Sequence, residues 1–185
     1  MKEIEILMEL LENKNSCIKK LTKIGSLKIN KIYDIYYTLD KKIKPNIFPR
    51  RVVRIRKKNK ESFLTYKIDH YNKNNVWQYS DEYEVKLSDF KRINKIIELI
   101  GFKKIIEINN TKYTFETEKY EIVVEDVLNL GLFLEVEIKK PSQERIKTQK
   151  DKIRKFIKTL GIKTGKELNK GKPELMIQKK NQLIG

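Results

Sequence analysis

Apolar and polar residues alternate most clearly within residues 127–140, which contain one glycine, Gly131. After this glycine, aliphatic side chains occupy every second position and mostly charged side chains lie between them. Successive side chains of a strand point to opposite faces, so Glu135 and Glu137 point the same way, about 7 Å apart. The pattern predicts a strand with one apolar face and one charged face.

Similar strand-like stretches occur along the whole chain, separated by polar turns or by glycine and proline. They are residues 2–10, 28–39, 51–58, 62–68, 76–87, 102–109, 112–116 and 119–125, and residues 174–178 add a closing candidate. The stretches on either side of Asn109 and Asn110 are two short strands or one long strand with an irregularity. Residues 41–49 are expected to form a loop, and so is the segment that carries His70.

Three segments show the periodicity of amphipathic helices. They begin at Asn15 or Ser16, Ser88 and Ser142, run to about Ile24, Ile100 and Leu160, and are each followed by a glycine. Cys17 falls on the apolar stripe of the first helix and is expected to be buried rather than reactive. In the last helix the lysines, Lys150 among them, are expected to face mostly water.

The order of these elements favours an antiparallel α+β sheet, because hairpin-length turns join most of the strands. About eight antiparallel strands can close into a barrel around one ligand. The alternation places the charges opposite the aliphatic residues. We therefore expect a closed, roughly eight-stranded barrel with a charged interior and surrounding helices, and a single domain over residues 1–185.

Composition and charge indicate the kind of partner and the cellular location. The chain has 185 residues, a net charge of +17 and one cysteine, which favours an anionic partner and a reducing, cytoplasmic location. Its apolar runs are shorter than the ~20 residues of a membrane span. Residues 139–172 hold thirteen Lys and Arg residues against three acids, so a basic domain that binds nucleic acid through this segment is one alternative.

Charged pairs spaced two residues apart recur on other strands. They are Glu3 and Glu5, Glu82 and Glu84, and Arg54 and Arg56, and Lys67 lies on the strand after the arginines. Any one acidic pair is best explained as a solvated strand face. Together on separate strands, the pairs favour a cavity for an anionic phosphate chain with divalent metals, since carboxylates bind hard cations and Arg and Lys bind phosphoryl oxygens.

The order and spacing of the motifs resemble the CYTH superfamily, also called triphosphate tunnel metalloenzymes. The motifs are Glu3-Ile4-Glu5, Asp34-Ile35-Tyr36-Tyr37, Val53-Arg54-Ile55-Arg56, Leu64-Thr65-Tyr66-Lys67, Glu82-Tyr83-Glu84, Gly101-Phe102 and residues 130–137. The superfamily includes class IV adenylate cyclases, thiamine triphosphatases, inorganic triphosphatases and, more distantly, RNA triphosphatases. The resemblance covers nearly the whole chain.

The resemblance implies a triphosphate bound in a charged tunnel and hydrolysed with Mg²⁺ or Mn²⁺. It assigns metal binding to Glu3, Glu5, Glu135 and Glu137, substrate binding to Arg54, Arg56, Lys67 and Lys112, and catalytic support to Glu82 and Glu84. Tripolyphosphate, ATP and thiamine triphosphate are the expected substrates. The 5′ triphosphate of RNA and a homodimer stay open as further partners, and no membrane association is expected.

Two positions depart from the family pattern. Leu7 stands where the first motif ends in lysine, and Asn110 stands where a later motif begins with a base. Lys86 or Lys139 are candidates to compensate. The departures leave one alternative to triphosphate hydrolysis, a degenerate member that binds polyphosphate or nucleotide with little turnover. A class IV-type adenylate cyclase that makes cAMP from ATP is another alternative, because the resemblance implies nearly the same tunnel electrostatics for both reactions.

Overall fold

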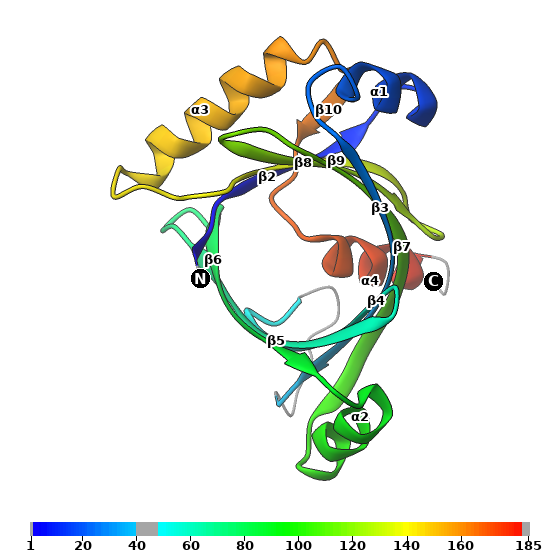
Figure 1. Ribbon diagram of the computed structural model, residues 1–185. Helices are drawn as coiled ribbons and strands as arrows, with labels where there is room; N and C mark the ends of the chain where they lie inside the picture. The colour runs from blue at the N-terminus through cyan, green and yellow to red at the C-terminus, as the bar shows by residue number, and fades with distance from the viewer. Residues whose placement is uncertain (1, 40–47, 183–185) are drawn as a thin grey trace.

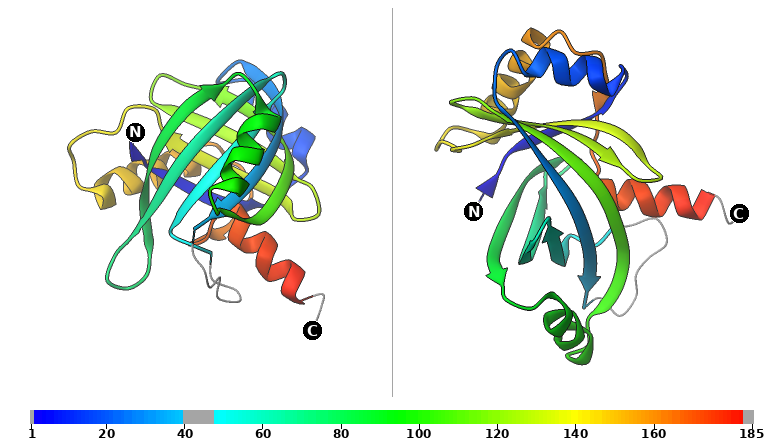
Figure 2. Two further views of the ribbon diagram at one scale, coloured as in Figure 1. Left: turned by 90° about the horizontal axis from the view of Figure 1, so that it is seen from below. Right: turned by 45° about the vertical axis from the view of Figure 1, so that its right-hand side comes forward.

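The computed structural model describes residues 2–39 and 48–182 and shows one curled antiparallel sheet with helices around it (Figures 1 and 2). The strands are β1 (Lys2–Glu3), β2 (Glu5–Leu10), β3 (Leu27–Thr38), β4 (Arg51–Lys58), β5 (Glu61–Tyr71), β6 (Trp77–Leu87), β7 (Lys103–Glu116), β8 (Tyr120–Val127), β9 (Gly131–Ile138) and β10 (Thr164–Glu167). The helices are α1 (Lys14–Leu21), α2 (Phe90–Leu99), α3 (Ile146–Thr159) and α4 (Lys172–Gln182). Most of the predicted 41–49 loop lies outside the described residues.

The sheet is ordered β1-β6-β5-β4-β3-β7-β8-β9-β2-β10. β1 and β2 are separated only by Ile4, yet β1 pairs with β6 and β2 pairs with β9. Residues 2–10 therefore bridge two distant parts of the sheet, which curls into the ring seen in Figure 1. The predicted antiparallel α+β sheet is confirmed. The described residues form ten strands rather than about eight, and the strand order ends at β1 and β10, so closure into a barrel is not confirmed.

The main apolar core lies on the outside of the curl, between the sheet and two helices. It contains Cys17 and Leu21 from α1, Ile153 and Ile157 from α3, and Ile122, Val124, Leu134 and Val136 from the sheet. A second cluster joins Ile97 of α2 to the outer faces of β3 and β4. Because alternate residues of each strand face outward into these clusters, the residues between them are turned inward.

Helix α4 corrects the prediction of a closing strand at residues 174–178. Pro173 lies in its first turn, where proline is tolerated, whereas proline would remove a hydrogen-bond donor from a strand. Met176 is buried against the inner face of the sheet, in a cluster with Leu7 and Ile108. One part of the sheet's interior is therefore apolar, and α4 covers it (Figure 2).

Two single-residue predictions are also wrong. His70 lies on β5 rather than in a loop; its Nε2 is 2.8 Å from Asp81 Oδ2 and its ring stacks on Tyr79. Lys150 is buried, and its ammonium donates to the Trp77 carbonyl at 3.0 Å and pairs with Glu167 at 3.4 Å. Helical periodicity gave no sign of Lys150's acceptors because they belong to β6 and β10.

Other boundaries differ by a few residues. The helix caps are Asn13, Asp89 and Arg145, and the last has no side-chain capping bond. β7 is one strand through Asn109 and Asn110, and its pairing there has no register shift. In the described part of the chain, none of the helices has both the length and the apolar character that crossing a membrane requires.

Candidate functional site

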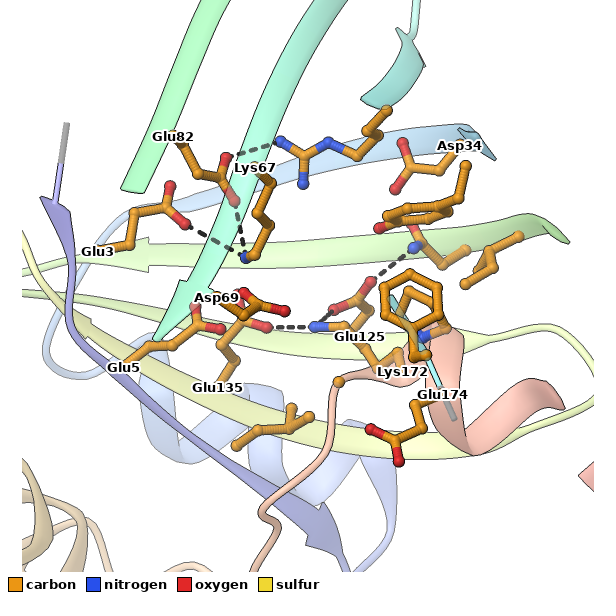
Figure 3. Close-up of a pocket in the computed structure, with 18 of the residues that line it drawn as sticks. Glu3, Glu5, Asp34, Lys67, Asp69, Glu82, Glu125, Glu135, Lys172 and Glu174 are labelled. Atoms are coloured by element: carbon orange, nitrogen blue, oxygen red, sulfur yellow. Dashed lines mark hydrogen bonds and ion pairs between the residues drawn. The ribbon is translucent and has the colours of Figure 1, made fainter. Parts of the chain in front are cut away.

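The inner face of the sheet lines a pocket of about 1020 Å³, including the space open to solvent (Figure 3). Nine of the ten predicted site residues line it: Glu3, Glu5, Arg54, Arg56, Lys67, Glu82, Lys112, Glu135 and Glu137. Glu84 does not; its carboxylate accepts a hydrogen bond from Thr65 Oγ1 at 2.8 Å. The tertiary structure thus brings together residues from seven strands.

The β8–β9 hairpin places four carboxylates on this face. They are Glu121, Glu125, Glu135 and Glu137. The turn between the strands runs through Asn129 and Gly131, whose φ angles are 63° and 144°. Asparagine and glycine tolerate such angles at little cost, so the predicted break at Gly131 is a hairpin turn.

One side of the pocket is a cluster of crowded carboxylates. Glu137 lies in register with Glu5 on β2 and with Glu121 on β8, and neighbouring strands are only about 4.8 Å apart. Burial and then the nearby carboxylates raise the pKa of Glu137 to about 9. Burial likewise raises the pKa of Glu3 to about 8 and that of Glu5 to about 7. Burial and the neighbouring carboxylates therefore disfavour the charged forms of these three groups more than the nearby cations favour them.

Cations lie directly beside this cluster, and Lys67 Nζ is 3.7 Å from Glu3 Oε2. Glu82 accepts a hydrogen bond from Arg54 Nη2 at 3.0 Å and pairs with Lys67 Nζ at 2.7 Å. Although burial opposes it, the charges of Arg54 and Lys67 hold the pKa of Glu82 well below its usual range. Arg54 is buried, and its Nε has no hydrogen-bond partner in the part of the chain that the structure describes.

Arg56 is held differently, by a residue that the sequence analysis had quoted only as part of a motif. Its Nε and Nη2 donate to the two carboxylate oxygens of Asp34, both at 2.8 Å. Asp34 is buried and, despite burial, Arg56 lowers its pKa. This two-point contact fixes the plane of the guanidinium.

Lys112 belongs to β7. Its Nζ lies between two carboxylates, 3.8 Å from Glu125 Oε2 and 3.7 Å from Glu135 Oε1. Asn110, where the family pattern has a base, donates from Nδ2 to Glu125 Oε1 at 2.5 Å. The amide thus satisfies a buried carboxylate without adding positive charge to the pocket.

Sequence reasoning assigned no role to several charged residues that line the pocket. They are Asp34, Asp69, Glu121, Glu125, Lys172 and Glu174. Alternation along residues 119–125 could have shown that Glu121 and Glu125 share a face. Lys172 had no such signal, since it lies on the helix mistaken for a strand. The two lysines considered as substitutes lie elsewhere: Lys86 pairs with Glu61 and Lys139 with Glu116.

Aromatic rings form another part of the lining. Tyr36 and Phe48 meet edge to face with ring centroids 5.8 Å apart, and Tyr71 and Trp77 also line the pocket. Flat apolar surfaces of this kind suit the ring of an organic ligand.

The carboxylate cluster is chemically suited to a hard divalent cation, which prefers oxygen ligands. Within residues 2–39 and 48–182, no three acidic, histidine or cysteine side chains already converge as a metal site. The raised pKa values of Glu3, Glu5 and Glu137 nevertheless identify them as the groups with most to gain from a bound cation. The donor set therefore fits Mg²⁺ or Mn²⁺.

These electrostatics predict a pH dependence. Without ligand, the free energy of unfolding should fall as pH rises from about 5 to about 9, because the unfolded chain releases protons that the folded chain retains. The groups responsible are Glu3, Glu5 and Glu137, whose pKa values are raised. The Glu137→Gln variant loses one of them, so its melting temperature should exceed that of the unchanged chain by a margin that grows with pH.

Thermal unfolding at about pH 5, 7 and 9 measures this margin. A Glu118→Gln variant is the control, since Glu118 is exposed and outside the pocket, and its curve should run parallel to that of the unchanged chain. A margin for Glu137→Gln that shrinks with rising pH would contradict the assignment.

The fold and the site together define a protein that encloses an ionic pocket within a curled antiparallel sheet. The chain belongs to the CYTH family: the family model described as the CYTH domain matches residues 1–171. The resemblance inferred from the motifs is therefore confirmed.

Known relatives agree with this membership. The chain is 31% identical over 138 residues to the Methanocaldococcus jannaschii protein named "Putative adenylate cyclase MJ0240", a match that covers 73% of this chain and 75% of that protein. The PH1012 protein from Pyrococcus horikoshii has a similar structure, with a TM-score of 0.75 at 20% identity over 94% of this chain and 98% of that one.

Another protein of similar structure is HpAC1 from Hippeastrum, a putative adenylyl cyclase said to reveal a dominant triphosphatase activity. It has a TM-score of 0.58 at 16% identity, covering 92% of each chain. At such identities the two solved structures support the fold alone.

Proposed function

We propose that the pocket binds a triphosphate and that the chain hydrolyses it with a divalent cation, Mg²⁺ or Mn²⁺. The observation that carries the proposal is Arg54, whose buried Nε finds no acceptor in the described residues. A buried donor without an acceptor costs about 1–3 kcal/mol, so an anionic ligand that completes it is the best explanation.

Cations on the sheet would bind the phosphate chain. They are Arg54, Arg56, Lys67 and Lys112. Their ion pairs with pocket carboxylates hold them in place before a ligand arrives, so little reorganisation is needed when phosphoryl oxygens reach them. In the transition state the same groups would stabilise the negative charge spread over the terminal phosphoryl group.

Glu3, Glu5 and Glu137 would hold the divalent cation, with Glu135 beside them. When bound, the cation would offset the negative charge of the phosphate chain and polarise its phosphoryl groups. Water attacks the terminal phosphorus, the bond to the bridging oxygen breaks, and inorganic phosphate leaves.

In this proposal Glu82 and Glu84, the two residues first assigned to catalysis, position other side chains. Glu82 positions Arg54 and Lys67 rather than accepting a proton, because its low pKa makes it a weak base. Glu84 lies outside the pocket lining and orients Thr65, whose hydroxyl also contacts Arg54 at 3.2 Å.

Adenylate cyclase activity is the second candidate, favoured by the aromatic lining. The rings of Phe48 and Tyr71 could stack on a nucleobase. In this reaction the ribose hydroxyl attacks the α-phosphorus and pyrophosphate leaves, and the same cations serve. The name of the M. jannaschii relative favours a cyclase, whereas the description of HpAC1 favours a triphosphatase.

Two other functions have less support. Leu7 and Asn110 favour a pocket that binds polyphosphate or nucleotide with little turnover. Nucleic-acid binding through residues 139–172 is weakened because cations of this segment, Lys150 and Arg154 among them, are already paired with acids. RNA 5′ triphosphates and a homodimer stay predictions.

The test is release of phosphate from tripolyphosphate, ATP and thiamine triphosphate, with Mg²⁺ and Mn²⁺ separately, and of cAMP from ATP. We expect metal-dependent phosphate release that a Glu5→Gln/Glu137→Gln variant lowers by at least about a hundredfold, since it removes two oxygen ligands of the cation. Formation of cAMP without phosphate release would favour the cyclase. Binding without either product would favour the binding-only alternative.

A further inference from the structure

Strand β6 has a free edge along residues 83–87. β1 pairs with β6 at Ser80 and Asp81, and among residues 2–39 and 48–182 no strand other than β5 pairs with residues 83–87. Figure 1 shows β6 at one end of the curl, beside the start of the chain. Alternate residues of such an edge direct their backbone N–H and C=O groups away from the sheet, where another strand can pair with them.

The same segment exposes apolar side chains on the outer face of the sheet. Tyr83 is 62% exposed and Val85 57%, and Tyr66, in register with Tyr83 on β5, is 40% exposed. The apolar cluster beneath α2 takes in Leu64 and Leu87 but does not include these three residues. An edge that combines free backbone groups with exposed apolar side chains is suited to the addition of a strand.

The charges of this edge can pair with a second copy of themselves. Glu84 and Lys86 flank Val85, and their side chains are 42% and 65% exposed. If two antiparallel copies of β6 met at a twofold axis through Val85, Glu84 of each copy would lie opposite Lys86 of the other. An axis through position 84 or 86 would instead place two glutamates or two lysines opposite each other. The charges therefore favour one register.

We propose that β6 pairs with β6 of a second copy of this chain in a symmetric dimer centred on Val85. The two valines meet at the axis, and Tyr83 packs beside Leu87 of the other copy. Each Glu84 forms an ion pair across the interface with Lys86, and the two curled sheets become one continuous sheet. This dimer does not depend on what the pocket binds.

The net charge of the chain opposes association at long range. Each copy carries a charge of +17, but salt at about 0.15 M screens exposed charges that are more than about 8 Å apart. At that salt concentration the contacts at the edge decide whether two copies pair. Lowering the salt concentration should therefore weaken the dimer.

Sedimentation equilibrium of the full chain at about 1–500 µM and about 0.15 M salt measures the dimer. We expect a reversible shift from the mass of one chain, 22.2 kDa, to twice that mass. Val85→Lys places two like charges at the axis and should raise the dissociation constant at least about tenfold. Ile29→Lys is the matched control, because Ile29 is a 55% exposed residue of β3, with β4 and β5 between it and β6. Its dissociation constant should equal that of the unchanged chain.

An exchange of charges tests the register. Lys86→Glu alone and Glu84→Lys alone should each dimerise weakly, because like charges then oppose each other at both pairs. Mixed in equal amounts, the two variants should form a heterodimer, since every glutamate then lies opposite a lysine. Failure of the mixed variants to associate would overturn this register and the inference with it.

The Val85→Lys comparison decides by itself if Glu84→Lys folds poorly beside Arg54. An unchanged chain that stays monomeric over the whole concentration range would overturn the inference. So would a dimer that Val85→Lys weakens no more than Ile29→Lys does, because two copies would then meet through another surface. These outcomes leave the proposed triphosphate binding untouched.

Discussion

Replacing Arg54 with methionine should weaken tripolyphosphate binding by at least about a hundredfold and lower the free energy of unfolding by about 3 kcal/mol. The first effect follows because the buried Nε of Arg54 has no acceptor among residues 2–39 and 48–182, and a guanidinium can donate to an anion at two points. The second follows because Glu82, buried beside it, would lose the ion pair with Arg54 that complements its pair with Lys67.

Titration calorimetry with tripolyphosphate and Mg²⁺ measures the first effect, and urea unfolding at neutral pH measures the second. Arg54→Lys should be intermediate in binding, because an ammonium keeps the charge but cannot form the planar two-point contact. Arg51→Met is the control on the same strand, since Arg51 is exposed, and both quantities should stay near those of the unchanged chain. Equal binding by Arg54→Met would remove the main support for the proposed function.

Tripolyphosphate with Mg²⁺ should raise the melting temperature by about 5–10 °C at a ligand concentration near 100 times Kd. Burial and neighbouring carboxylates disfavour the charged forms of Glu3, Glu5 and Glu137 in the free protein, and a bound cation would favour those charged forms. At that concentration the complex is therefore expected to be more stable than the free chain by about 2.7 kcal/mol.

Glu5→Gln/Glu137→Gln separates the two parts of this effect. Without ligand at about pH 8 it should melt at a higher temperature than the unchanged chain, because two crowded carboxylates are gone. With Mg²⁺ and tripolyphosphate it should gain little. Differential scanning fluorimetry with and without each component measures both. If the addition of both components leaves the melting temperature of the unchanged chain the same, the proposed function is wrong.

The carboxylates of the pocket therefore fall into two groups with different surroundings. Glu82 and Asp34 are bound to arginines and have lowered pKa values, whereas Glu3, Glu5 and Glu137 are crowded and have raised ones. A sequence motif of two glutamates cannot show this difference, because both kinds of pair look the same along the chain. The difference in pKa arises from the side chains that the neighbouring strands place beside each carboxylate.

The sequence alone was sufficient to identify the two faces of the sheet. Strand geometry alternates side chains with a period of two, so a local pattern assigns Glu135 and Glu137 to one face and Leu134 and Val136 to the other. Alternation together with the family resemblance selected ten site residues, of which nine line the pocket. It also led to the CYTH family, since motif order is a property of the chain itself.

Only the tertiary structure decided how distant parts of the chain meet. The bridging of β6 and β9 by residues 2–10, the burial of Lys150 and the position of Lys172 in the pocket each depend on partners far away in sequence. Residues 174–178 form a helix because Met176 packs against Leu7 inside the curl, a contact that local propensity does not encode. Periodicity determines which way a side chain points, but register and helix packing determine what it meets there.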